Sequence, residues 1–342
     1  MALLHEVDGG LIGRDEFIAR GITRATVDPT AFKPIGIGLP LTISMRHFYT
    51  GREPRTDWLG WGDKDMLLTS ASKATTEFEP AARAINLIRN NVPRRSPVST
   101  ISATEAGTPI IYHSPAMVEQ SVVVSFEAFF DNFPKDLVKS LSSLVQAAAG
   151  IPLFAGANAV LSAAGIALDL AAELGEAIFD GDALFAPSAE EINFLKPGVP
   201  PTQAGYLLLV SDRDEAEFTH ECTLDLSGRA VLRGTDQPYT GDVPYVTLAV
   251  DGHVRPDLKE FQATRAAGDR VNRFLGNKED SKSVGDTIID GLKLANDLAF
   301  RRRADSLDPQ ILNASGDEKA RLEKLKAALL KNISNDLLKP GT

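Results

Sequence analysis

The sequence predicts an α+β protein that combines an antiparallel β-sandwich of about eight or nine strands, an inserted hydrophobic helical hairpin and a C-terminal helical region. Three observations lead to this prediction. Apolar and polar residues alternate with a period of two over much of 35–250, and turns rich in Gly, Pro and Asp separate the runs. A segment of 29 residues without a formal charge, 140–168, interrupts this pattern. After Pro256 the spacing of apolar residues becomes helical.

These patterns divide the chain into three regions. We expect an N-terminal segment at 1–34, a β-sandwich domain at 35–255 with a helical insertion at 134–196, and a C-terminal helical region at 256–342. The distribution of charge supports the last boundary, because the net charge is strongly negative before it and slightly positive after it.

Composition excludes several classes of protein. With 43% hydrophobic and 24% charged residues among 342, the chain has the composition of a folded protein rather than a disordered or polytopic membrane protein. A net charge of −10 argues against nucleic-acid partners, because binding to phosphate needs a basic surface. The single cysteine, Cys222, excludes an intrachain disulfide. The N-terminus lacks the pattern of a secretory signal, so the sequence predicts a cytoplasmic protein.

Nine runs of residues are typical of β-strands. The clearest is 216–226, where Phe218, His220 and Cys222 fall on one face of the predicted strand. Ser227-Gly228 then predicts a hairpin turn. The candidate strands are 39–48, 65–72, 98–103, 109–113, 120–130, 206–211, 216–226, 229–232 and 244–250.

The uncharged segment predicts a helical hairpin rich in alanine and glycine. Pro152 follows Gly150, a combination that ends one helix and allows a second to begin. About 20 apolar residues span a bilayer and small residues let helices pack in lipid, so the hairpin suits a membrane; burial in the core is the alternative. A short helix is expected from Ser188, because Ser188-Ala189-Glu190-Glu191 matches a capping box. The side chains expected to face a membrane or partner are Leu144, Phe154, Val160, Leu161, Ile166 and Leu168.

The C-terminal region predicts two helices joined by an exposed linker. The last helix carries an apolar stripe at coiled-coil spacing, which favours self-association or docking of a partner helix; covering of the protein's own core is the alternative. Arg301, Arg302 and Arg303 fall in the predicted linker and form a candidate processing site for an Arg-directed protease. The stripe consists of Leu322, Leu325, Leu329, Ile333 and Leu337.

Acidic residues cluster in two predicted loops and could bind a hard cation through their oxygens. Their D-x-D spacing resembles the calcium-binding loops of C2 domains, which implies a Ca²⁺ site where the two loops meet. Turns also favour Asp, so a purely local role is the alternative. Trp58 and Trp61 lie in the first loop and would form a contact site if exposed. The candidate ligands are Asp57, Asp63, Asp65, Asp212 and Asp214.

Three short segments resemble, in their order, the motifs of penicillin-recognising serine hydrolases: Ser70-Ala71-Ser72-Lys73, Asp131-Asn132 and Tyr239-Thr240-Gly241. The resemblance implies that Ser70 is a nucleophile that Lys73 activates from one helical turn away. The sequence departs from the family in three ways. Phe130 replaces the middle serine, Tyr239 replaces the last lysine, and Ser70 continues a strand-like run.

The sequence as a whole favours a non-catalytic interaction protein. Its most specific form is a triggered, pore-forming effector that inserts the hydrophobic hairpin into a membrane. We expect a protein partner or a second copy of the chain, and Ca²⁺ is the one cofactor that the sequence suggests. The alternatives are a hydrolase that uses Ser70 and Lys73 or a divalent metal in the acidic loops, and a calcium-dependent C2-like binding module.

Overall fold

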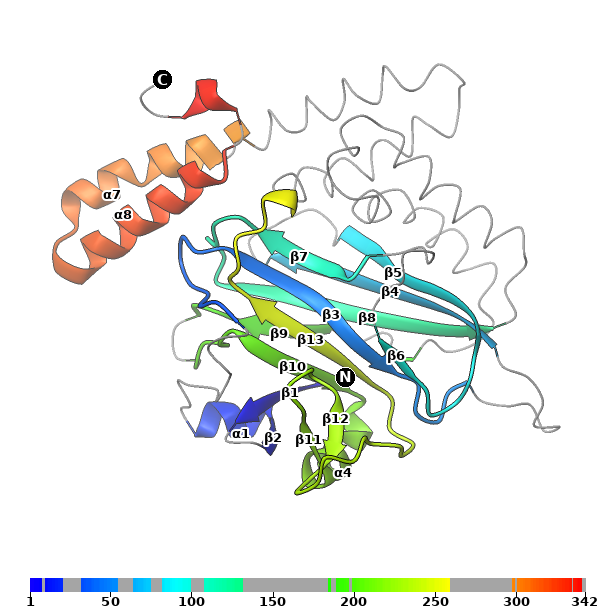
Figure 1. The fold of residues 1–342 in the computed structure, drawn as a ribbon. Coiled ribbons are helices and arrows are strands. Elements are labelled where there is room, and N and C mark those ends of the chain that lie inside the picture. The colour runs from blue at the N-terminus through cyan, green and yellow to red at the C-terminus, as the bar shows by residue number, and fades with distance from the viewer. Residues whose placement is uncertain are drawn as a thin grey trace, which may run out of the picture.

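The computed structural model describes a mixed α+β protein with thirteen strands in three antiparallel sheets and few helices among the described residues (Figure 1). The described residues are 1–7, 10–20, 32–54, 64–74, 82–99, 108–131, 184–185, 189–196, 199–258, 297–298, 300–333 and 335–339. The predicted helical hairpin lies outside these residues.

The largest sheet has seven strands in the order β2-β1-β10-β13-β3-β6, and β7 also pairs with β3. Its first two strands come from the N-terminal segment, so the boundary predicted near residue 34 does not separate this segment from the sheet. The sequence offers little signal there, because β1 is apolar on both faces and β2 is very short. The strands are β1 (Ala2–Val7), β2 (Gly10–Gly13), β3 (Leu41–Tyr49), β6 (Pro97–Ser99), β7 (Ile110–Ser114), β10 (Gly205–Val210) and β13 (Tyr245–Asp251).

The second sheet has four strands in the order β5-β4-β8-β9, and β11 and β12 form a separate two-stranded sheet. Most strand ranges predicted from the alternation are confirmed within about two residues, but β5 was not predicted. These strands are β4 (Lys64–Ala74), β5 (Ala82–Val92), β8 (Ser121–Asp131), β9 (Ala189–Asn193), β11 (Cys222–Leu224) and β12 (Ala230–Leu232).

The two large sheets share the main hydrophobic core. On β4, Met66 and Leu68 are fully buried and point toward the seven-stranded sheet, as alternate residues of a strand must. Ile43 on β3 and Leu248 on β13 belong to the same cluster, as does Phe126 on β8. Each sheet therefore buries one face against the other.

Two predicted elements are wrong. The run 216–226 is not a strand: its first part is helix α4 (Glu215–Glu221), and only β11 is extended. Phe218 and Cys222 are buried together in either conformation, but His220 is exposed, which a strand with Phe218 facing the core would not allow. The capping-box motif at Ser188 precedes strand β9 instead of a helix, because pairing with β8 outweighs the local signal.

The C-terminal helices pack on the end of the seven-stranded sheet that carries β7. Helix α7 (Asp308–Asn313) and helix α8 (Gly316–Lys331) form a hairpin, and Figure 1 shows it projecting beside the sheets. Asn332 fixes the end of α8, because its amide donates to the carbonyls of Ala116 at 2.7 Å and Ala328 at 2.9 Å. Among the residues that the structure describes, no helix is long and apolar enough to span a bilayer.

Candidate functional site

Strands β8 and β9 lie side by side and are joined by residues 132–183, which include the uncharged segment 140–168. They pair antiparallel, with Ser121 opposite Asn193 and Ser125 opposite Ala189. Closer to the insertion, Ala128 and Leu184 exchange two backbone hydrogen bonds of 3.1 and 2.9 Å. The chain therefore leaves the four-stranded sheet after β8 and returns to the same place on it.

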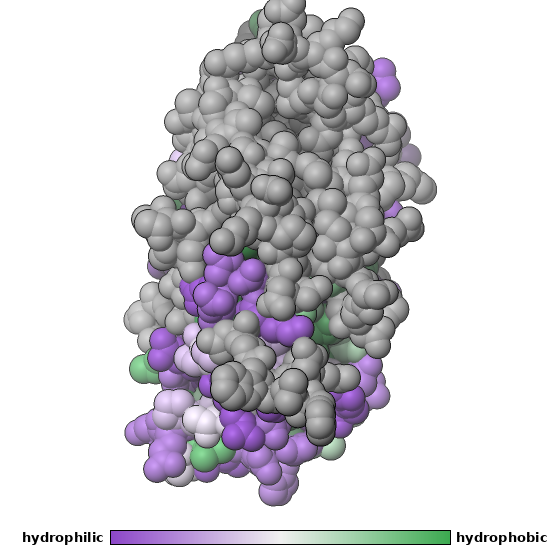
Figure 2. All heavy atoms as spheres, turned by 90° about the vertical axis from the view of Figure 1, so that its right-hand side faces the viewer, coloured by the Kyte–Doolittle hydropathy of each residue, from purple (hydrophilic) through white to green (hydrophobic). Residues whose placement is uncertain are grey.

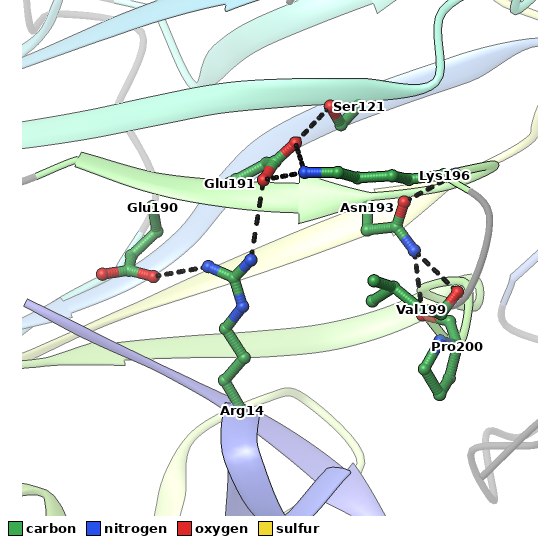
Figure 3. A network of polar contacts seen from close by, with 8 residues as sticks. All are labelled: Arg14, Ser121, Glu190, Glu191, Asn193, Lys196, Val199 and Pro200. Atoms are coloured by element: carbon green, nitrogen blue, oxygen red, sulfur yellow. Dashed lines mark hydrogen bonds and ion pairs between the residues drawn. The ribbon is translucent and has the colours of Figure 1, made fainter. Parts of the chain in front are cut away.

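A network of polar side chains connects strand β9 to its neighbours (Figure 3). Arg14 is the first residue of helix α1 (Arg14–Ala19), and its guanidinium lies 3.8 Å from Glu190 and 3.6 Å from Glu191. The Ser121 hydroxyl donates to Glu191 at 2.6 Å, and the Lys196 ammonium lies 3.3 Å from the same carboxylate. The network thus joins the N-terminal helix, β8 and the edge strand β9.

The two glutamates of this network differ in their proton affinity. The hydrogen bond from Ser121 holds the pKa of Glu191 below its usual value, and the nearby cations Lys196 and Arg14 act in the same direction. Burial raises the pKa of Glu190, the residue that precedes Glu191 on β9. Glu191 is the group that the members of the network share, because Ser121, Arg14 and Lys196 all lie against its carboxylate.

The turn after β9 is also fixed by side-chain hydrogen bonds. The Asn193 amide donates to the carbonyls of Val199 at 3.1 Å and Pro200 at 3.0 Å, and its oxygen accepts from the backbone of Lys196 at 2.8 Å. Next to it, the rings of His5 and Phe17 stack with centroids 3.9 Å apart. A cavity of only about 10 Å³ remains between these groups, which is room for about one water molecule and not for a substrate.

The four-stranded sheet carries an apolar patch on the face that points away from the main core. Leu67 on β4 lies opposite Ile88 on β5 and opposite Phe129 on β8, so the three side chains share this face. We call these three residues the outer patch. None of them belongs to the core cluster, whose members Met66 and Leu68 flank Leu67 and point the other way. Phe129, a member of the outer patch, lies two residues before the end of β8. The outer patch is therefore close to the point where residues 132–183 begin.

The acidic candidates do not meet at one point in the described structure. Asp65 accepts from the backbone of Asn91 at 3.1 Å, and Asp212 lies 2.7 Å from the amino group of Met1. Asp214 is buried and forms a bidentate ion pair with Arg52. Among the described residues, no group of three His, Cys, Asp or Glu side chains could hold a metal ion. Asp57, Asp63, Trp58 and Trp61 lie outside the described residues.

The arrangement that a penicillin-recognising hydrolase needs is not formed by Ser70 and Lys73. Ser70 is buried in the middle of strand β4, where it lies opposite Phe126 of β8. Lys73 follows three residues later on the same strand, so it points to the opposite face of the sheet. In that family the serine opens a helix and the lysine lies one turn later. A strand cannot bring Ser70 and Lys73 together in this way.

The leucine stripe mainly covers the protein's own core. Leu322, Leu329 and Ile333 are buried in a cluster with Ala116 and Val118, which follow β7. Leu325 is partly buried against the same cluster, whereas Leu337 is 86% exposed and is the one stripe residue that remains free for a partner.

The expected exposed linker at the triple arginine is wrong, because residues 300–306 are helical. Arg301 lies 3.0 Å from Asp305 one turn later, and Arg303 lies 3.4 Å from Glu119 beyond β7. Ala304 is fully buried in the cluster with the leucine stripe. The three arginines are thus part of the packed C-terminal helices, not of an extended loop.

The residues that join β9 to α1 and β8 were missed by the sequence analysis. Glu190 and Glu191 were interpreted as the end of a capping box, and Arg14 stands in a segment without a clear period. The side chains predicted to face a membrane, Leu144, Phe154, Val160, Leu161, Ile166 and Leu168, lie outside the described residues. Figure 2 shows that the described residues visible on this face of the molecule are mainly hydrophilic, with small separate hydrophobic areas.

Comparison with known proteins gives no matching family model, no similar curated protein and no similar solved structure.

Proposed function

We propose that the protein is a non-catalytic interaction protein that acts by exposing residues 132–183 to a membrane. The observation that carries the proposal is the pairing of β8 with β9, which attaches both ends of this segment to neighbouring strands. A segment attached in this way can change its position while the ladder between the two strands stays intact. Its 29 consecutive uncharged residues give it the composition to enter a bilayer.

In the resting state, the segment would dock on the outer patch. The two large sheets form a β-sandwich in this proposal, and the main core between them does not depend on the outer face. Leu67 and Ile88 are apolar side chains on that outer face, where a sheet exposed to water would carry polar ones. The patch lies beside the point where the segment begins, so the segment is its nearest apolar neighbour along the chain.

Release of the segment would then expose two apolar surfaces at once, the outer patch and the segment itself. Entry into lipid removes the apolar surface of the segment from water, and this burial favours binding to a membrane. The network around Glu191 would keep β9 in the sheet during this change, because it anchors the returning strand to α1 and β8.

Flotation with phosphatidylcholine vesicles tests this function with three matched substitutions. Phe129→Asp places a charge in the outer patch and should increase the bound fraction, because it weakens docking. Leu161→Asp places the same charge in the segment and should abolish binding, also when combined with Phe129→Asp. Leu226→Asp is the control, because Leu226 is 89% exposed on a turn and its substitution should change nothing.

Vesicle binding that is the same in all variants would contradict the proposal. No binding by any folded variant would also contradict it and would favour a protein as the partner. Circular dichroism of each variant shows whether the fold is retained.

A further inference from the structure

A second site lies between the seven-stranded sheet and the C-terminal helices. None of its lining residues belongs to residues 132–183. It is a cavity of about 200 Å³ lined by residues that belong to, or lie next to, four elements: β3, β7, β13 and α8. Much of its lining is apolar and comes from Pro40, Pro115, Val254 and Ile333. Ligand pockets of proteins typically measure about 300–1,000 Å³, so this one suits a molecule smaller than a drug.

The charged residues of the lining are basic. They are Arg255 and Lys331, with the neutral polar residue Asn332 and the imidazole of His113 nearby, and the described residues that line the pocket include neither Asp nor Glu. In the chain as a whole, by contrast, acidic residues outnumber basic ones by 46 to 36. Two cationic side chains beside one apolar cavity therefore favour a ligand that carries an anionic group.

The walls of this pocket are held in place before any ligand binds. The His113 imidazole is buried, and its Nδ1 lies 3.0 Å from the Thr42 hydroxyl, which fixes the ring. On the opposite wall, the hydrogen bonds from Asn332 to Ala116 and Ala328 fix the end of α8 next to Lys331. A preformed pocket loses less conformational entropy on binding than one that must close.

We propose that this pocket binds a small organic monocarboxylate whose apolar body contacts Pro40, Pro115 and Ile333. Its carboxylate would lie toward Arg255 and Lys331, which are less buried than His113 and lie at the outer part of the lining. This site does not depend on the proposed membrane function, because none of its residues lies in the four-stranded sheet or the insertion.

A titration of the full-length protein followed by ¹⁹F NMR tests the site with two probes of equal shape. 4-Fluorobenzoate carries the charge, and 4-fluorobenzamide is its neutral counterpart. We expect the benzoate to bind at least about threefold more tightly, and Lys331→Gln to reduce that difference, because Arg255 remains as the second cation. Lys319→Gln removes a lysine at the other end of α8 and should leave both affinities unchanged.

A third variant locates the binding. Val254 is 72% exposed at the edge of the pocket, so Val254→Trp should block the cavity without disturbing the core, and both probes should then bind more weakly. The inference would be overturned by the absence of binding for both probes, or by equal binding of the two that Lys331→Gln does not change. Benzoate binding that Val254→Trp leaves intact would place the site elsewhere and would also overturn it.

Discussion

At the scale of single residues, the ion pair between Arg52 and Asp214 is the clearest case of a charge that depends on its partner. The two groups form hydrogen bonds of 3.2 and 2.6 Å, and the Asp214 side chain is only 9% exposed. A buried carboxylate without its counterion is costly, so the pair matters for stability even if its net contribution is small.

We therefore expect Arg52→Ala to lower the free energy of unfolding by about 2–3 kcal/mol. The loss is smaller than for a fully buried pair, because Arg213 remains 3.7 Å from Asp214. Arg95→Ala is the matched control: the pair of Arg95 with Asp242 is more than half exposed and should contribute less than about 1 kcal/mol. Urea denaturation of the two variants measures the difference, and equal losses would refute this interpretation.

Glu6 is the residue whose protonation should affect stability near neutral pH. Burial raises its pKa from 4.5 to about 7, and the negative charge of Asp225 adds to the shift. Because the pKa is higher in the folded state, the stabilising contribution is complete below about pH 4.5 and is lost as the pH rises through 7.

Glu6→Gln should consequently be more stable than the parent protein at pH 8, by about 1–2 kcal/mol after allowance for partial exposure. At pH 4.5 the advantage should disappear, because the Glu6 carboxyl of the folded parent protein is then protonated and neutral, like the amide of the variant. Denaturation curves at the two pH values give the comparison, with the exposed Glu323→Gln as the control for the loss of one charge. An advantage that does not change with pH would contradict the assignment.

At the scale of elements, alternation of apolar residues predicted the central strands well, because one face of each lies in the shared core. It failed where other patterns give the same spacing. Phe218 and Cys222 are four residues apart, a distance that places them together on a helix as well as on a strand. The ion pair between Arg14 and Glu191 could not be predicted, because it joins segments more than 170 residues apart.

The network around Glu191 also gives a prediction for one element, strand β9. Arg14→Gln removes the cation that joins α1 to this edge strand, so the backbone amides of β9 should exchange hydrogen faster. Global stability should fall by less than about 1 kcal/mol, because the Arg14 side chain is 39% exposed. Hydrogen exchange followed by mass spectrometry resolves the two effects.

Arg20→Gln is the control for this experiment, because Arg20, at the end of α1, forms its ion pair with Glu16 of the same helix. Unchanged exchange of 189–196 in Arg14→Gln, or the same change in both variants, would show that the network does not hold the strand.

At the scale of the whole molecule, the described sheets and helices share buried apolar clusters. The two sheets, the N-terminal strands and the C-terminal helices are joined by three buried clusters, each built from residues distant in sequence. Strands β8 and β9, which precede and follow residues 132–183 in the sequence, pair directly with each other. A large change in the position of residues 132–183 is thus compatible with an unchanged core.

The most direct measurement is the environment of one fluorophore within the insertion. Cys222 is fully buried, and burial raises its pKa to about 12, so a cysteine introduced elsewhere can be labelled selectively. We would attach an environment-sensitive dye at Ala159→Cys in the Phe129→Asp variant and add phosphatidylcholine vesicles with a quencher in their acyl chains. We predict that the vesicles quench the emission of the dye at position 159. They should leave the emission of the same dye at Leu226→Cys unchanged. Emission at position 159 that vesicles do not change would contradict the proposal that this segment enters the membrane.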